Sequence, residues 1–205
     1  MVKQALTDID VKDKRVLVRV DFNVPIEQGI DSIRDYDHRL RSTLPTIEYL
    51  IGQSIKIILC SHLGRPKGQI VENLRLAPIG DRLAELLALP VTSLEDCVGT
   101  HVHNSVENMD FGDIILLENL RFYPGEEKND PEFSSAIASL AEVFVQDGFG
   151  VAHRAHASTE GVTHFLPSVA GLLVKKEIEI LSNLIEFPES PMVLVLGGAK
   201  ISDKI

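Results

Sequence analysis

Short apolar runs that end in polar or charged residues recur along this chain, and they constrain its fold more than any other feature. Residues 55–60 read IKIILC and are followed directly by SHLGRPKG at 61–68. Such an apolar run suits a strand buried on both faces of a parallel sheet. The glycines after it permit a sharp turn or a close approach to a ligand. Ligands bind at the carboxyl ends of strands in open α/β sheets, although a plain basic turn fits this stretch equally well.

The same pattern continues as an alternation of strands and helices. Apolar runs predict further strands at 15–21, 90–92, 113–117, 142–146 and 192–196, and helical stripes predict helices at 39–50, 74–87, 131–140 and 168–185. Residues 26–38 and 124–130 are predicted as loop and turn, and 96–109 show no single pattern. Pro45 is expected to make the first turn of its helix irregular. The alternation predicts an α/β fold, with a doubly wound parallel sheet in three αβα layers.

Composition narrows the class of protein. The 205 residues carry a net charge of −10, which argues against a general binder of nucleic acid or anionic membranes. No apolar run approaches membrane-spanning length, and the N-terminal residues lack the core of a signal peptide. Cys60 and Cys97 form no C-x-x-C pair, so we expect reduced thiols and a cytoplasmic location. The chain stops one turn into a predicted helix, so we expect a truncated protein.

Polar side chains follow several of the predicted strands. Because parallel strands point the same way, their carboxyl ends share one edge of the sheet. Arginine binds phosphate and carboxylate through a planar, bidentate fork, so a cluster of arginines at that edge favours one small, multiply charged anion. The residues expected there are Asp21, Asn23, Arg39, His62, Arg65, Arg121, His153 and Arg154.

Asp21 allows three interpretations. It can be structural, pairing with Arg19 or capping a turn. It can be an aspartyl nucleophile, but the D-x-D motif of such phosphatases has Asn23 in its second position here and so lacks the general acid. Asp21 and Asn23 can instead hydrogen-bond a hydroxyl group of a ligand held in the basic site.

Three other motifs resemble known ligand-binding patterns only in part. Gly148-Phe149-Gly150 begins like a dinucleotide fingerprint, but His153 takes the third glycine position, which argues against NAD. His153 and His156 have H-x-x-H spacing, yet no third metal ligand stands at a diagnostic distance in the sequence. Residues 197–200, GGAK, fit either a solvated basic turn or a phosphate cradle at a helix start, without the spacing of a P-loop.

Five segments together resemble the phosphoglycerate kinase family. They are VRVDFNVP at 18–25, SHLGRPKG at 61–68, LLENLRFYPGEE at 116–127, AHRAHAST at 152–159 and GGAKISDKI at 197–205. They occur in the family's order and span nearly the whole chain. The resemblance implies one lobe of a bilobal kinase: a phosphoglycerate-binding N-terminal lobe at 1–170, an interdomain helix at 171–188, and the start of a truncated nucleotide-binding lobe at 189–205.

The resemblance also implies a role for each matching residue. Asp21 and Asn23 would contact the glycerate part of the substrate. Arg39, Lys200 and Lys204 would serve the transferring phosphoryl group, and Lys204 would also reach the nucleotide phosphates. The basic patch on the anionic groups of the substrate would consist of Arg39, His62, Arg65, Arg121 and Arg154. The chain departs from the family at Gln146 and Gly148, where asparagine and alanine are usual, and the loop before Arg39 looks longer.

The implied reaction belongs to glycolysis and gluconeogenesis and moves phosphoryl between 1,3-bisphosphoglycerate and ADP, giving 3-phosphoglycerate and ATP. The carboxylate of 3-phosphoglycerate is already deprotonated, so catalysis would consist of positioning and charge neutralisation. Mg-ADP or Mg-ATP would be bound mostly by the second lobe. We expect this chain alone to bind phosphoglycerate weakly and without turnover. We also expect it either to self-associate or to have a disordered tail, whereas the full-length enzyme would be a monomer. A non-catalytic anion-binding module and a phosphohydrolase using Asp21 remain the alternatives.

Overall fold

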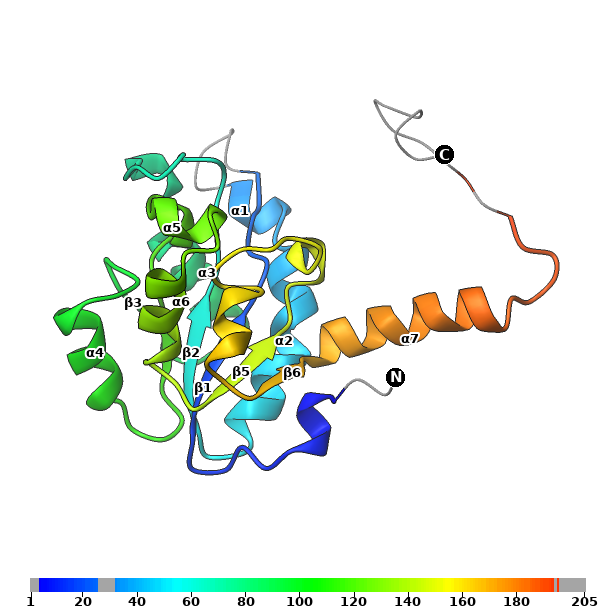
Figure 1. Cartoon of the computed structure of the whole chain (residues 1–205), viewed down its shortest axis with the longest axis horizontal. Helices are drawn as coiled ribbons and strands as arrows, with labels where there is room; N and C mark the ends of the chain where they lie inside the picture. Colours follow the sequence, from blue (N-terminus) through cyan, green and yellow to red (C-terminus); the bar gives the residue numbers. More distant parts are fainter. Residues whose placement is uncertain (1–3, 26–31, 194, 196–205) are drawn as a thin grey trace.

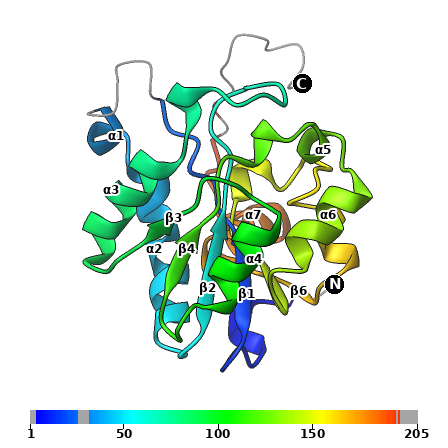
Figure 2. The same ribbon diagram turned by 90° about the vertical axis from the view of Figure 1, so that its left-hand side faces the viewer.

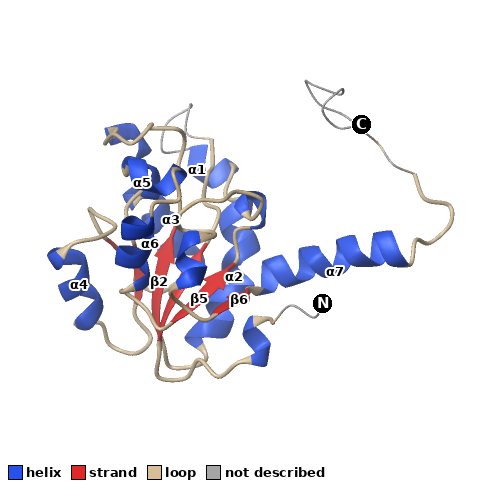
Figure 3. Ribbon diagram, viewed as in Figure 1, coloured by secondary structure: helices blue, strands red, loops and turns tan. Residues whose placement is uncertain are grey.

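The computed structural model describes residues 4–25, 32–193 and 195, which fold around a six-stranded sheet (Figure 3). All neighbouring strands are parallel, in the spatial order β3-β4-β2-β1-β5-β6. The strands are β1 Arg15–Arg19, β2 Lys56–Cys60, β3 Thr92–Ser93, β4 Ile114–Leu116, β5 Val143–Gln146 and β6 Ser168–Ala170. The α-helices are α1 Ser32–Asp35, α2 His38–Ile51, α3 Ala77–Leu87, α4 Thr100–Glu107, α5 Pro124–Glu127, α6 Pro131–Ala138 and α7 Leu172–Glu186. Short 3₁₀ helices are η1 Leu6–Asp8, η2 Glu72–Leu74, η3 Leu120–Phe122, η4 Phe149–Val151 and η5 Gly161–His164.

The central strands carry a hydrophobic core on each face. In β1, Val16 and Val18 belong to one buried cluster, whereas Leu17 between them belongs to the other. The first cluster takes side chains from α2 and α3, and the second takes them from α4 and α6. Figure 2 shows these two pairs of helices on opposite sides of the strands. The predicted three-layer α/β fold with a doubly wound parallel sheet is therefore confirmed.

The order of the strands places a crevice between β1 and β5. After β1 the chain continues to β2, and after β5 it continues to β6, and these two strands lie on opposite sides of the β1–β5 pair. The chain therefore leaves the carboxyl ends of β1 and β5 in opposite directions. Such a switch point opens the groove in which doubly wound proteins bind their ligands.

Local sequence signals account for individual helix ends. The Asp130 carboxylate accepts a hydrogen bond of 2.9 Å from the Phe133 amide, and Pro131 occupies the first position of α6, as predicted. Helix α3 ends at Leu87, and the next residue, Ala88, has a left-handed φ of 52°. Helix α2 runs without a break through Pro45, so the irregular first turn expected there is wrong.

The helix predicted at 168–185 is divided in two. Residues Ser168–Ala170 pair with β5 as strand β6, and α7 begins only at Leu172. Gly171 separates the elements, because its amide donates a hydrogen bond of 2.9 Å to the Gln146 carbonyl and so continues the ladder between strands. Val169 is buried in the core, a position that the helical stripe and the strand both satisfy.

Four shorter predictions also differ from the structure. Helix α1 lies in the predicted loop, α4 in the segment without a clear pattern, and α5 in the predicted turn. The strand predicted at 192–196 is wrong at the residues that the structure describes, because Met192, Val193 and Val195 are not in a strand. The sixth strand of the sheet is β6 instead.

Helix α7 extends away from the body of the molecule (Figure 1). Near its start Val174 is buried, whereas Ile185 at its far end is 80% exposed and Phe187 is 75% exposed. Among the described residues, none of the helices combines the length and the apolarity needed to cross a bilayer.

Candidate functional site

His62 lies at the predicted rim, the edge of the sheet where the carboxyl ends of the parallel strands meet. It follows β2, is almost fully buried, and its Nδ1 lies 3.1 Å from Nη2 of Arg19. Burial, the largest cause, and the positive charges of Arg19, Arg121, Arg154 and Arg39 together lower the pKa of His62 to about 2. The ring is therefore neutral, and arginines that follow or belong to four different elements are gathered around it.

Arg19 is the member of this cluster that the sequence analysis missed. It is only 1% exposed and is the largest fully buried side chain. Its Nε donates a hydrogen bond of 2.8 Å to Ser158 Oγ, and its Nη1 donates to the Val20 carbonyl. The sequence did carry a signal, since a charged residue inside a strand covered on both faces has no route to solvent and needs buried partners.

Asp21 and Arg39 form an ion pair directly beyond the end of β1. Gly150 lies against this pair, and a Cβ atom there would be 2.6 Å from Asp21 Oδ2. A cavity of about 170 Å³ adjoins the pair, with Asp21, Arg39 and Gly150 in its wall. Glycine at position 150 thus lets the loop after β5 approach the carboxylate closely.

The loop after β2 is fixed from two sides at Gly64. The Gly64 amide donates a hydrogen bond of 2.8 Å to Asn23 Oδ1, and Arg121 Nη1 donates one of 2.8 Å to the Gly64 carbonyl. Gly64 has a φ of +63°, where an L side chain is strained. Asn23 and Arg121 are therefore brought to the same loop, although part of their hydrogen-bonding capacity serves the fold.

Asn119 joins the loops that follow β2 and β4. Its Oδ1 accepts hydrogen bonds of 3.2 Å from the amides of Leu63 and Arg121. Its Nδ2 donates to the carbonyls of Leu63 at 2.8 Å and Leu74 at 3.0 Å. The side chain is fully buried and fully satisfied, so it sets the position of η3 and with it the backbone of Arg121.

Arg121 and Arg154 retain unused donors at the rim. Burial lowers the pKa of Arg121, and the neighbouring charges of Arg154 and Arg19 lower it further against the opposing effect of Glu127. Arg121 Nε lies 3.2 Å from Glu127 Oε1 in an ion pair without a hydrogen bond. Arg154 Nε is buried and has no hydrogen-bond partner among the described residues. Buried donors of this kind favour an incoming anionic acceptor.

Arg65, another predicted site residue, lies outside this cluster. Arg65 is exposed, and its charge is not among those that lower the pKa of His62. It makes no hydrogen bond or ion pair in the described part of the chain. Lys200 and Lys204 lie outside the described residues.

The H-x-x-H pair is not arranged as a metal site. His153 is exposed, whereas His156 is buried, with its Nδ1 3.7 Å from Glu126 Oε1. Across residues 4–25, 32–193 and 195, no group of three or more His, Cys, Asp or Glu side chains is placed to hold a metal ion.

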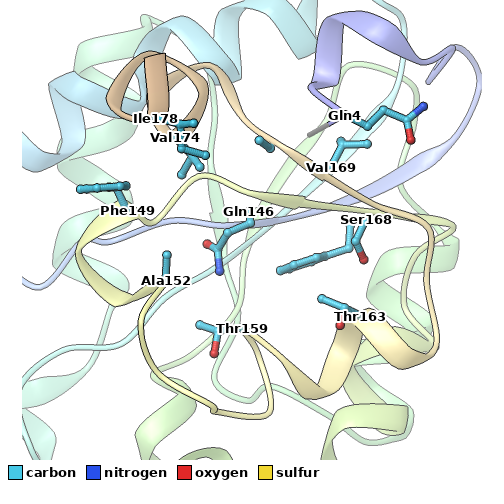
Figure 4. Close-up of a pocket in the computed structure, with 12 residues that line it drawn as sticks. Gln4, Gln146, Phe149, Ala152, Thr159, Thr163, Ser168, Val169, Val174 and Ile178 are labelled. Atoms are coloured by element: carbon cyan, nitrogen blue, oxygen red, sulfur yellow. The ribbon is translucent and has the colours of Figure 1, made fainter. Parts of the chain in front are cut away.

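Gln146 faces a second cavity rather than the arginine cluster. This cavity has a volume of about 500 Å³ and lies among β5, β6, η5 and α7, with Gln146, Phe149, Val174 and Ile178 around it (Figure 4). Gln146 Oε1 accepts a hydrogen bond of 3.0 Å from the Gly148 amide. The glutamine side chain therefore fixes the backbone of the turn after β5.

Comparison with known proteins places this site in a family. The family model described as phosphoglycerate kinase matches residues 6–205. A phosphoglycerate kinase from Dictyoglomus turgidum is 58% identical over 98% of this chain and 50% of its own length. One from Pelotomaculum thermopropionicum is 55% identical over 100% of this chain and 51% of its own length. The chain thus spans about half the length of the curated relatives it matches.

Solved structures agree with this comparison. The crystal structure of phosphoglycerate kinase from Pyrococcus horikoshii matches with a TM-score of 0.86 and 32% identity, over 98% of this chain and 50% of that one. The structure from Coxiella burnetii matches with a TM-score of 0.82 and 35% identity, over 99% of this chain and 50% of that one. By the match over its sequence and by its fold, the chain belongs to the phosphoglycerate kinase family.

Proposed function

We propose that this chain provides the phosphoglycerate-binding lobe of a phosphoglycerate kinase. In this proposal residues 1–170 form the substrate-binding lobe, 171–188 form the interdomain helix, and 189–205 begin the nucleotide-binding lobe. Family membership over residues 6–205 and the coverage of half of each relative support this division.

One observation carries the proposal: the positive charges of Arg39, Arg121 and Arg154 all lower the pKa of the same buried histidine, His62. They come from α2, from η3 after β4 and from the loop after η4, so only the fold brings them together. Mutual repulsion makes such a cluster costly unless an anion compensates it. Three guanidinium groups around one neutral ring suit a small acid that carries both a carboxylate and a phosphate.

We assign the site residues the roles that the family resemblance implies. Arg121, Arg154 and Arg65 bind the anionic groups of 3-phosphoglycerate or 1,3-bisphosphoglycerate, and Arg65 does so from an exposed position on the loop after β2. Asp21 and Asn23 contact the glycerate part. Arg39 lies beside Asp21 at the β1–β5 crevice and stabilises charge on the phosphoryl group during transfer.

The chemistry needs little from these residues beyond orientation and charge. The acceptor carboxylate of 3-phosphoglycerate is ionised at neutral pH, so the chain supplies no general base. His62, with a pKa of about 2, remains a neutral hydrogen-bonding group rather than an acid. The arginines hold the substrate in line for transfer and neutralise the developing charge. Closure of a second lobe would exclude water from the acyl phosphate.

Nucleotide binding is assigned to the second lobe. Lys200 and Lys204 serve the transferring phosphoryl group, and Lys204 reaches the phosphates of Mg-ATP or Mg-ADP. The described residues provide no cluster suited to hold a metal ion, so we assign no Mg²⁺ ligand to them and derive no step through it.

Calorimetry with 3-phosphoglycerate tests the binding site. We expect weak binding by this chain, an affinity loss on the order of ten- to a hundredfold in Arg154→Ala, and no loss in Arg34→Ala. The control is matched in chemistry, because Arg34 is an exposed arginine of α1 that pairs with Glu85. Equal affinity of both variants and wild type would refute the proposed site. A coupled assay with ATP should show no turnover by the chain alone.

The alternatives make different predictions. A phosphohydrolase would lose phosphate release in Asp21→Asn, but in the structure that carboxylate is engaged by Arg39 and accepts a hydrogen bond of 3.3 Å from the Asn23 amide. A non-catalytic anion-binding module would stay inactive when a phosphoglycerate kinase C-terminal lobe is added, whereas a kinase lobe would gain activity.

We also propose that the full-length enzyme is a monomer in the cytoplasm and that this chain alone self-associates. The second proposal rests on the exposed apolar side chains of α7 and of the segment after it, including Ile185, Phe187 and Val195. Analytical ultracentrifugation tests it, and a monomer at all concentrations would contradict it. Buried, unpaired Cys60 and Cys97 agree with a reducing compartment.

A further inference from the structure

The contact between Arg19 and His62 determines which nitrogen of the imidazole carries the proton. Arg19 Nη2 lies 3.1 Å from His62 Nδ1. A guanidinium group can only donate hydrogen bonds, so Nδ1 must be the acceptor. In a neutral ring the proton then resides on Nε2, and the Nε2–H group remains available to donate to a ligand.

A buried chain of contacts holds Arg19 from behind. Ser158 Oγ accepts from Arg19 Nε at 2.8 Å and donates to Glu126 Oε1 at 2.6 Å. The Ser158 amide donates to Glu126 Oε2 at 3.0 Å. Glu126 and Ser158 are both 0% exposed. The Ser158 hydroxyl proton is committed to the carboxylate, so its oxygen is oriented to accept from the guanidinium group.

We propose that Glu126, Ser158 and Arg19 are positioning residues that hold His62 as its Nε2–H tautomer, so that the ring donates a hydrogen bond to an oxygen atom of the bound phosphoglycerate. The proposal rests on the proposed function of the rim. Arg19 donates to Nδ1 of His62, and Ser158 orients the Arg19 guanidinium group by accepting from its Nε. Glu126 supplies the negative charge that compensates Arg19.

The opposite tautomer would not serve this site. It would present a lone pair to a carboxylate or phosphate oxygen, and it would direct an N–H group at the Arg19 guanidinium. A protonated ring would add a charge next to Arg19, Arg39, Arg121 and Arg154, the arginines that already act on it. The neutral Nε2–H form donates to an anion without that repulsion. The chain of contacts thus makes the donor available at any pH near neutrality.

Nuclear magnetic resonance of the ¹⁵N-histidine-labelled chain reads the tautomer directly and needs no ligand. We expect His62 to show an unprotonated Nδ1 and a protonated Nε2, without change between about pH 5 and pH 8, the range in which ordinary histidines titrate. A proton on Nδ1, or titration of His62 within that range, would overturn the proposal.

Ser158→Ala tests the chain of contacts against Ser134→Ala, which removes another fully buried serine hydroxyl, one that donates to the Asp130 carbonyl. We expect Ser158→Ala to shift or broaden the His62 nitrogen resonances and to weaken 3-phosphoglycerate binding about three- to tenfold. Ser134→Ala should change neither. Unchanged His62 resonances in a folded Ser158→Ala variant would refute the positioning role of Ser158. A wild-type chain that shows the expected tautomer and does not bind 3-phosphoglycerate would instead refute the proposed function alone.

Discussion

Two buried carboxylates, Glu126 beneath the basic cluster and Asp147 beside the start of α7, respond to burial in opposite ways. Both are 0% exposed. Burial alone would raise the pKa of Glu126, but the His156 ring, the charge of Arg19 and the hydrogen bonds from Ser158 lower it below its ordinary value. Burial raises the pKa of Asp147 to about 6, against hydrogen bonds from Thr46 and from the amides of Leu173 and Val174.

The difference shows that compensation, rather than depth, decides whether a buried carboxyl group stays ionised. Both oxygens of Glu126 accept hydrogen bonds from Ser158, and a buried guanidinium group lies one residue further. Asp147 accepts from the Leu173 amide through Oδ1, whereas its buried Oδ2 has no hydrogen-bond partner among the described residues. Glu126, beneath the rim, therefore stays ionised, whereas Asp147, beside the start of α7, can take up a proton.

The largest effect is expected from Glu126→Ala. The substitution leaves Arg19 buried without its compensating charge, which should lower the free energy of unfolding by about 3–5 kcal/mol. Urea denaturation of this variant and of Glu95→Ala, which removes an exposed carboxylate, measures the difference. A loss below about 1 kcal/mol for Glu126→Ala would mean that the charge of Glu126 does not compensate the buried charge of Arg19.

The next largest effect is a pH dependence that comes from Asp147. Its pKa is about 6 in the folded chain and near 3.8 in the unfolded chain, so between these values the native state holds more protons. The contribution of Asp147 to stability should therefore fall by about 3 kcal/mol as pH rises from about 4 to about 6.

Asp147→Asn isolates this contribution from the other carboxyl groups. The variant lacks the titration, so its stability relative to wild type should rise by that amount across the same pH range and stay constant above it. Denaturation curves of both proteins at each pH give the difference. A difference that does not vary with pH would show that Asp147 ionises normally.

A smaller effect is expected from Gly171→Ala, which tests how tightly Asp147 is enclosed. A Cβ atom at Gly171 would lie 2.7 Å from the Asp147 Cβ. Such overpacking should cost about 1–3 kcal/mol. Gly52→Ala is the control, because its nearest neighbour, the Tyr49 carbonyl oxygen, would be 3.4 Å away. Equal melting temperatures of the two variants would contradict the enclosure.

The smallest effect is expected where a carboxylate is exposed. Glu142 lies 3.6 Å from Arg15 Nε in a solvated pair. Glu142→Gln should change the free energy of unfolding by less than about 1 kcal/mol and should lose even that difference in high salt. A larger cost in urea denaturation would mean that solvent exposure is not what separates this carboxylate from Glu126.

The sequence predicted the central strands and their shared rim because each signal was local. The apolar runs of β1, β2, β4 and β5 are buried on both faces, so composition alone marks them. The three residues of β6 could not be separated from α7, since Val169 fits an inward position in either element. There the decision depends on Gly171 and the Gln146 carbonyl, a contact between segments distant in the sequence.

The buried part of the site was harder to predict. Nothing near Glu126 distinguishes it from Glu127, because its burial depends on Ser158, 32 residues away in the sequence. Arg19 ends a strand whose second face is covered by α4 and α6, and only these helices, which are distant in the sequence, show that the arginine must be enclosed. Residues in the rim motifs were found because polar groups after a strand end are visible in the sequence itself.

The outward course of α7 has a consequence for its amide protons. Val174 is buried against the body, whereas Ile185 is 80% exposed. Helical hydrogen bonds that lack tertiary packing open by fraying, at little cost in free energy. Deuterium uptake should therefore be slow in the first turns of α7 and become progressively faster toward Glu186, so that one helix samples a wide range of exchange rates along its fifteen residues.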